Sequence, residues 1–160
     1  MHVACVQVAF NESTPAAYQE LAYELLGQAV GHDLVLLPEM WPCGYFGFEH
    51  YATVAQTLDG PLVKELGERA RFLKAWLLAG SIVERCGEQL YNTSLLFDQH
   101  GKLVAHYRKT HLFSYQSREK ELLSPGRSAV VVDTPWGRAG LAICYDLRFP
   151  ELFRAMVDQG

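Results

Sequence analysis

The chain has 160 residues, of which 49% are hydrophobic and 20% are charged, so it can form one compact domain and is too short for two ordinary ones. Its formal net charge is -4 and its lysine and arginine residues are scattered, which argues against a nucleic-acid-binding surface. Residues 1–10 lack the basic start and the long apolar stretch of a secretory signal or a membrane span, so we expect a cytoplasmic protein without a membrane partner.

The first half of the chain alternates between strand-like and helix-like patterns. A valine-rich run and a continuous apolar run are typical of strands, the second of a buried parallel strand. Residues 11–14 have side chains that favour a turn and can cap a helix, and the apolar residues that follow them recur at helical spacing. A Gly-Pro pair at 60–61 then precedes a second stretch with the pattern of an amphipathic helix. We therefore predict strands over 3–8 and 34–37, and helices over 14–30 and 61–74.

The second half of the chain is dominated by extended patterns, with turn residues at two positions between them. We predict strands over 76–83, 91–97, 102–107, 129–132 and 138–143, tight turns over 98–101 and 134–137, and a last helix over 150–158. This order of elements predicts a layered α/β domain with a mixed sheet.

The cysteines lie far apart and form no CxxC pair, so their spacing indicates neither a zinc cluster nor a dense disulfide scaffold. We expect reduced thiols, one of which could be reactive. The four are Cys5, Cys43, Cys86 and Cys144.

Cys144 follows an apolar predicted strand and precedes a predicted helix start. Pro150 holds Phe149 extended and suits the first helical turn, and Glu151 suits the positive end of the helix dipole. A thiol at such a strand-to-helix elbow lies near backbone N–H groups that can favour a thiolate and later bind an oxyanion. A buried core cysteine is the alternative, which the residue type taken alone favours.

Glu39 comes just past the buried strand predicted over 34–37. In open α/β sheets, ligands bind beyond the carboxyl ends of the strands, and partial burial there would suit a carboxylate to general-base work on a thiol or a water. A solvated loop glutamate is the alternative, and the position alone does not separate the two.

Lys109 lies just past the strand predicted over 102–107. A lysine ammonium beside a cysteine would stabilise a thiolate and then a tetrahedral oxyanion. The alternative is that this basic cluster at a strand end is simply exposed to solvent, which is the usual case. His106 and His111 flank this lysine, but no third ligand at useful spacing accompanies them, so we expect structural or surface histidines and no metal site.

The positions of Cys144, Glu39 and Lys109 relative to the predicted strands favour a functional role for all three. Cys144, Glu39 and Lys109 each follow the carboxyl end of a separate strand. One sheet edge could therefore gather a nucleophile, a base and a cation.

Three segments, in this order, together resemble the nitrilase-like carbon-nitrogen hydrolase superfamily, and its amidase branch in particular. They are LLPE with GY at 36–45, YRKTHLF at 107–113, and the highly specific GLAICYDLRFPE at 140–151. The likeness runs from about Val3 to the end of the chain. It implies an α/β fold, a nitrilase-like α-β-β-α sandwich with mixed sheets, formed by one domain over residues 1–160 that is incomplete at its C-terminus.

Carried over residue by residue, the resemblance makes Glu39 the general base, Lys109 the cation beside the oxyanion and Cys144 the nucleophile. It also brings a second glutamate, which the family places a few residues before a Pro-Gly turn such as the one at 125–126. Glu119 is the best-placed candidate and Glu121 is a rival. A charged run on a solvated loop is the alternative for both.

The resemblance implies a catalytic cycle without metal or organic cofactor. Glu39 takes the thiol proton while Cys144 attacks the amide carbon, and Lys109 holds the oxyanion with the backbone N–H of Tyr145. Ammonia leaves after protonation by Glu39. Water activated by Glu39 then releases the carboxylic acid from the thioester.

Arg148 bears on the substrate, because a guanidinium a few residues from the nucleophile could hold a carboxylate in a bidentate grip. A salt bridge to Asp146 or Glu151 is the alternative role. The resemblance to the amidase branches, which include omega-amidase-like enzymes, makes Tyr145 and Tyr45 the other substrate-binding candidates. We expect a small-molecule amide substrate that bears a carboxylate, with N-carbamoyl-amide hydrolysis as the open alternative.

Members of the family usually form dimers, and their domain continues beyond the helix that follows the nucleophile, where this sequence stops at Gly160. Missing strands would leave apolar surface and strand edges uncovered. We expect the full-length protein to be a homodimer. The alternative to an active enzyme is an inactive fragment that needs a complementing C-terminal half. A cysteine redox protein is a third hypothesis, weakened because no resolving cysteine lies near Cys144 in sequence.

Overall fold

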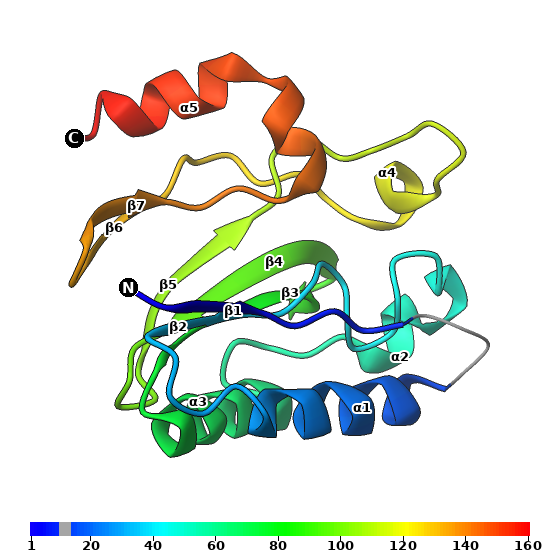
Figure 1. Ribbon diagram of the computed structural model, residues 1–160. Coiled ribbons are helices and arrows are strands. Elements are labelled where there is room, and N and C mark those ends of the chain that lie inside the picture. The colour runs from blue at the N-terminus through cyan, green and yellow to red at the C-terminus, as the bar shows by residue number, and fades with distance from the viewer. Residues whose placement is uncertain (10–13) are drawn as a thin grey trace.

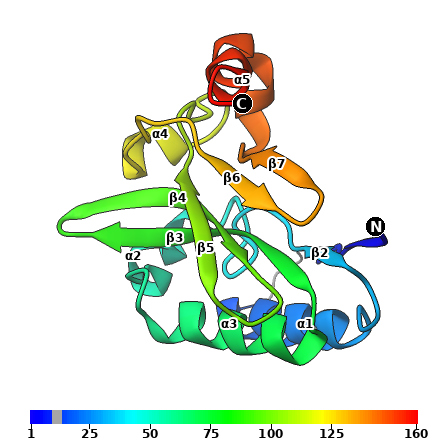
Figure 2. The ribbon, with the colours of Figure 1, turned by 90° about the vertical axis from the view of Figure 1, so that its left-hand side faces the viewer.

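The computed structural model describes residues 1–9 and 14–160, which are arranged in four layers. Two helices lie against one face of a five-stranded sheet, a two-stranded hairpin lies over the other face, and the last helix covers the hairpin (Figures 1 and 2). The helices of these layers are α1 (Pro15–Gly27), α3 (Pro61–Leu73) and α5 (Pro150–Val157). The predicted α-β-β-α sandwich with mixed sheets is confirmed.

The larger sheet has the strand order β1-β2-β3-β4-β5. The first three strands are mutually parallel, whereas β3 pairs with β4, and β4 with β5, in antiparallel fashion. The carboxyl ends of β2, β3 and β5 therefore meet at one edge of this sheet. The strands are β1 (Val3–Cys5), β2 (Leu34–Leu36), β3 (Trp76–Cys86), β4 (Gln89–Phe97) and β5 (Leu103–Arg108).

The smaller sheet consists of β6 (Val131–Thr134) and β7 (Gly137–Gly140), which pair only with each other. The strand predicted over 138–143 is therefore too long, because its ladder ends at Gly140 and the next three residues continue without a strand partner. Short helices that the sequence patterns did not predict also occur. They are η1 (Phe48–His50), α2 (Tyr51–Val54), α4 (Glu119–Leu122) and η2 (Cys144–Arg148).

The helix ends follow the capping signals in the sequence. Thr14 accepts a hydrogen bond from the backbone N–H of Ala17, and a proline occupies the first turn of each long helix. The predicted turn and cap segment at 11–14 is described only at Thr14, and the rest lies outside the described residues. The first helix ends earlier than predicted, because Gln28 and Ala29 turn back to the carbonyl groups three residues before them. No helix in residues 1–9 and 14–160 has the length and apolar content needed to cross a membrane.

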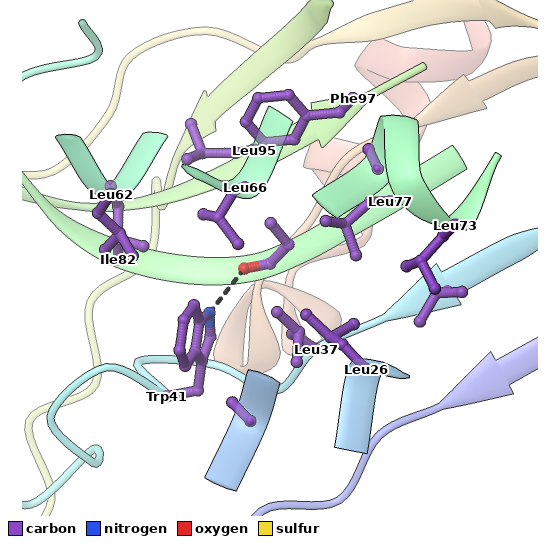
Figure 3. Close-up of a cluster of buried hydrophobic side chains, with 14 of the residues drawn as sticks. Leu26, Leu37, Trp41, Leu62, Leu66, Leu73, Leu77, Ile82, Leu95 and Phe97 are labelled. Atoms are coloured by element: carbon purple, nitrogen blue, oxygen red, sulfur yellow. Dashed lines mark hydrogen bonds between the residues drawn. The ribbon is translucent and has the colours of Figure 1, made fainter. Parts of the chain in front are cut away.

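The main hydrophobic core lies between α1, α3 and the larger sheet (Figure 3). Leu26 and Leu66 from the helices and Leu77 and Leu95 from the strands are almost fully buried there. Trp41, from the segment that follows β2, enters the same core and donates its indole N–H to a β3 carbonyl at 2.9 Å. The core therefore anchors the segment that carries Glu39.

A second apolar cluster packs the hairpin and α5 onto the opposite face of the larger sheet. Its buried members are Leu96, Tyr107, Leu141, Ile143, Leu152 and Met156. This packing, and not strand pairing, holds the two sheets together.

The backbone of Gly80 packs closely against the backbone of Pro38 and so fixes the residues around Glu39. Its φ is +60°, within an irregular part of β3, and a Cβ atom at this position would lie 1.9 Å from the carbonyl oxygen of Pro38. The neighbouring Ser81 donates its backbone N–H to the same oxygen at 3.3 Å, and its hydroxyl accepts the backbone N–H of Met40 at 3.0 Å. β3 therefore holds the chain on both sides of Glu39.

Replacing Gly80 by alanine should lower the free energy of unfolding by about 3 kcal/mol, from left-handed backbone strain of about 1 kcal/mol and the shift that the new Cβ forces on its neighbours. Gly87→Ala is the matched control, because Gly87 also has φ +60° but nothing lies within 4 Å of its Cβ position. Urea unfolding of both variants measures the difference. Equal losses would show that the contact with Pro38 contributes nothing.

Candidate active site

Glu39, Lys109 and Cys144 come from two sheets and not from one. Glu39 follows β2 and Lys109 follows β5, whose carboxyl ends share an edge of the larger sheet, but Cys144 begins η2 after the separate β6–β7 hairpin. The expectation that one sheet edge gathers all three residues is therefore wrong. The physical reason is that the apolar cluster between the sheets, with Tyr107 and Ile143 as members, packs the hairpin over that edge.

A buried ammonium group lies between two carboxylates at the centre of the site. The Nζ of Lys109 is 2.7 Å from Oε1 of Glu39 and 3.0 Å from both carboxylate oxygens of Glu119. The side chains of Lys109 and Glu119 are 0% exposed, and that of Glu39 is 19% exposed. Burial opposes the charge on Lys109, but the two carboxylates outweigh it and raise the pKa of the ammonium group. Lys109 therefore stays protonated as a fixed cation.

The structure separates the two candidates for the second glutamate. Glu119 starts α4 with its side chain turned inward, where it also accepts the backbone N–H of Phe113 at 2.7 Å. Glu121 is exposed and pairs with Arg118 on the surface. The geometry thus brings Glu119, and not Glu121, beside Lys109.

Asn92, in the middle of β4, was missed in the sequence patterns. Its Nδ2 lies 2.8 Å from Oε1 of Glu39 and 2.8 Å from Oε1 of Glu119, and its side chain is buried. Asparagine is depleted in strands, so its position inside an otherwise strand-like run was a usable signal for a special role.

Tyr45 lies against the inner side of this cluster. Its hydroxyl lies 2.9 Å from Oγ of Ser117 and 3.4 Å from Oε2 of Glu119, and its ring centroid is 5.6 Å from Nζ of Lys109. Burial raises the pKa of Tyr45 to about 12, so its hydroxyl is neutral. These contacts make Tyr45 a support for Glu119.

Cys144 presents its thiol at a strained elbow. It has φ +46°, is solvent-exposed and lies close enough to Glu39 and Lys109 for their charges to act on the thiol. Partial burial of the thiol and the negative charge of Glu39 raise its pKa, and the opposing effect of Lys109 is smaller. Lys109 thus favours the thiolate as expected, but burial and Glu39 outweigh it, so the thiol stays protonated until a base removes the proton.

Asp146 fixes the elbow that carries Cys144. Its fully buried carboxylate accepts the hydroxyl of Tyr107 at 2.7 Å and the backbone N–H of Ile143 at 3.0 Å. It also contacts the backbone N–H and Nδ1 of His111, at 3.0 and 2.8 Å. Because Tyr107 and His111 both lie two residues from Lys109, Asp146 ties the Cys144 elbow directly to the segment that carries Lys109.

Arg148 does not pair with Asp146 or Glu151, so the salt-bridge alternative is wrong. The Asp146 carboxylate is fully occupied by the donors described above, and Arg148 is exposed without an ion pair among the residues that the structure describes. The ring of Tyr145 packs edge-on against Phe113 and Phe149, with centroids 5.0 and 5.3 Å away. Arg148 thus offers a free guanidinium, whereas the Tyr145 side chain supports the elbow.

The histidines have structural or surface positions. His111 is held by Asp146 and stacks on Phe149 with ring centroids 3.7 Å apart, and His106 is exposed on β5. Within the described ranges, no group of three or more His, Cys, Asp or Glu side chains is placed to hold a metal ion.

The sequence matches the carbon-nitrogen hydrolase family model over residues 2–160. It is 37% identical to 2-oxoglutaramate amidase from Paenarthrobacter nicotinovorans over 100% of this chain and 58% of that protein. It is 38% identical to an omega-amidase from Homo sapiens over 81% of this chain and 49% of that protein. The chain therefore spans less than two thirds of the length of these relatives.

Solved structures show the same arrangement of the chain. A member of branch 10 of the nitrilase superfamily from Saccharomyces cerevisiae is 31% identical with a TM-score of 0.85, over 99% of this chain and 60% of that chain. A mutant amidase from Nesterenkonia sp. AN1 is 27% identical with a TM-score of 0.84, over 100% of this chain and 61% of that chain. That structure shows covalent addition of the acetamide moiety of fluoroacetamide at the active site cysteine.

Replacing Glu39 by glutamine should lower the pKa of the Cys144 thiol, because it removes a nearby negative charge while Lys109 remains. Alkylation of Cys144 by iodoacetamide at neutral pH, followed by peptide mass spectrometry, should accelerate about threefold for each unit by which the pKa falls, because a larger thiolate fraction is partly offset by weaker nucleophilicity. Cys5 and Cys86 are also exposed and serve as internal references in the same sample. An unchanged or slower rate at Cys144 would contradict the proposed influence of Glu39.

Proposed function

This chain belongs to the carbon-nitrogen hydrolase family, and we propose that it hydrolyses the amide bond of a small molecule through a thioester on Cys144, releasing ammonia. One observation carries the proposal: the exposed Cys144 thiol lies within electrostatic range of the Glu39 carboxylate, which a buried ammonium group holds in place. An accessible nucleophile, an adjacent base and a third group that orients the base form the arrangement that nucleophilic catalysis requires. We assign Cys144, Glu39 and Lys109 to these roles.

The proposed chemistry starts from the protonated thiol. Glu39 takes the proton as the sulfur forms a bond to the amide carbon, and Lys109 and the backbone N–H of Tyr145 stabilise the oxyanion. Glu39 returns the proton to the leaving nitrogen as the carbon-nitrogen bond breaks. Glu39 then takes a proton from water as the water oxygen attacks the thioester. When the carbon-sulfur bond breaks, that proton returns to the Cys144 sulfur, the carboxylic acid leaves, and Glu119 holds Lys109 throughout.

We infer that the substrate bears a carboxylate and that Arg148 binds it. The guanidinium of Arg148 is exposed, is free of ion pairs among the described residues and lies four positions after Cys144 in the sequence. A relative named 2-oxoglutaramate amidase supports an acid amide as the substrate class. An N-carbamoyl amide would use the same nucleophile, base and cation and is the alternative substrate.

We further propose a cytoplasmic location and a homodimer as the working state of the full-length protein. All four cysteines carry free thiols, as proteins of a reducing compartment do. Leu147 in η2 and Val157 in α5 expose 76% and 75% of their surface, so this outer layer presents apolar side chains that a second copy could cover.

A fragment that needs a complementing segment is the second candidate. An apolar cavity of about 250 Å³ lies between the two sheets, with Trp76, Leu96, Trp136 and Leu141 among its walls. Relatives have further chain beyond the matched part, and the chain spans only 58% of the 2-oxoglutaramate amidase. The activity of residues 1–160 alone therefore has to be measured directly.

The chain should release ammonia from a member of a panel of small amides and carbamoyl compounds, and intact mass should reveal an acyl adduct. Cys144→Ala should remove both signals while circular dichroism shows an unchanged fold, because no other described residue supplies the nucleophile. Turnover should fall by at least about a thousandfold. Appreciable hydrolysis by the variant would refute the nucleophile assignment, and a folded but silent wild-type chain would favour the fragment.

Arg148→Leu should reduce kcat/KM about tenfold to a hundredfold for carboxylate-bearing amides, the range expected on loss of a charged hydrogen bond. Neutral amides should be hydrolysed at the wild-type rate. Arg154→Leu is the matched control, because Arg154 is an exposed arginine on α5 that forms no ion pair among the described residues. Equal losses on charged and neutral amides would exclude substrate binding by Arg148.

A further inference from the structure

Asn92 is the one uncharged side chain that bridges the two carboxylates of the site within the described residues. It lies on β4, is 1% exposed and donates from Nδ2 to Oε1 of Glu39 and to Oε1 of Glu119, each at 2.8 Å. Its backbone carbonyl also accepts the N–H of Lys109 at 2.8 Å. A single residue therefore contacts all three charged members of the cluster.

The hydrogen bonds of Asn92 decide which oxygen of Glu39 is available. Oε1 accepts from the Asn92 amide and also from the Lys109 ammonium, at 2.8 and 2.7 Å. An amide N–H and an ammonium N–H are donors only, so both need the lone pairs of Oε1. Oε2 is thereby left as the oxygen of Glu39 that can take a proton from the thiol.

The fold gains little from this asparagine for its own sake. Its Oδ1 is buried and has no hydrogen-bond partner, which is rare for a buried polar atom and is unfavourable for stability. An apolar residue in the middle of β4 would avoid that loss. The retained amide is therefore explained by its two N–H groups, which hold carboxylates that would otherwise repel each other across the single cation.

We propose that Asn92 is a positioning residue that locks Glu39 with Oε2 directed at the Cys144 thiol. The proposal rests on the function proposed above, in which Glu39 is the base. In the reaction, the S–H proton moves to Oε2 while the sulfur electron pair forms the bond to the amide carbon, and Oε1 keeps its two hydrogen bonds. Asn92 acts on the thiol through Glu39, while its bond to Glu119 anchors the amide, and it does not touch the reacting atoms.

Two variants remove both amide donors in different ways. Asn92→Leu keeps the branched shape of the side chain but is larger, and Asn92→Ala is the second variant because it avoids overpacking. Ser94→Ala is the matched control, because Ser94 is also buried, lies two positions along β4 and contacts neither carboxylate. Far-ultraviolet circular dichroism and thermal unfolding identify which variants fold.

On an amide that the wild-type chain hydrolyses, both Asn92 variants should lower kcat about tenfold to a hundredfold with little change in KM, and Ser94→Ala should match the wild type. A mispositioned base slows the chemical step without weakening substrate binding. Wild-type kcat in a folded Asn92 variant would overturn the proposal.

A second measurement does not depend on turnover, so it still applies if the chain proves not to be an amidase. Alkylation of Cys144 by iodoacetamide should accelerate in both Asn92 variants, because a loosened Glu39 acts less strongly on the thiol. Combining each variant with Glu39→Gln should add nothing to the effect of Glu39→Gln alone, since Asn92 acts through Glu39. Additive effects, or no effect of Asn92 on the alkylation rate, would overturn the positioning role.

Discussion

The rest of the site depends on one interaction, the burial of the Lys109 ammonium between the carboxylates of Glu39 and Glu119. A charge without solvent is strongly unfavourable unless opposite charges and hydrogen bonds compensate for it, so loss of either carboxylate leaves the cation exposed to that penalty. The partners come from distant parts of the chain. The segment after β2, the segment after β5 and α4 must therefore all be in place before the cation can be buried.

Backbone groups take part in the contacts that hold the segments around Glu39 and Lys109. Gly80 and Ser81 clamp the residues around Glu39, and the N–H of Gly126 donates to the Lys109 carbonyl at 2.8 Å. A Cβ at Gly126 would lie 2.0 Å from the carbonyl oxygen of Arg108, so only glycine permits this approach. Asp146 supplies the remaining constraint by attaching the strained Cys144 elbow to residues on both sides of Lys109. The nucleophile and the cation are thus positioned by the same short stretch of chain.

Sequence patterns predicted the elements of the fold because periodicity and capping act locally. Helix starts at Pro15, Pro61 and Pro150 and the three long strands of the larger sheet follow from such signals. The separation of β6 and β7 into a second sheet was not predictable in that way, because it depends on which faces pack together.

The side-chain network of the site was still less accessible to sequence reasoning. Asn92 meets Glu39 and Glu119 across 53 and 27 positions, and no local pattern encodes such contacts. The choice between Glu119 and Glu121 likewise needed the inward turn of α4. The rise in the pKa of the Cys144 thiol could not be predicted either, because burial and the charge of Glu39 outweigh Lys109, a balance that requires the three-dimensional surroundings. That balance also has a chemical consequence, because thiolates and not thiols are the species that oxidants attack. Two carboxylates facing one ammonium disfavour a further anion, so in the proposed reaction the sulfur becomes nucleophilic only as Glu39 accepts its proton. The exposed elbow therefore keeps the Cys144 thiol accessible while its raised pKa protects the sulfur from oxidation.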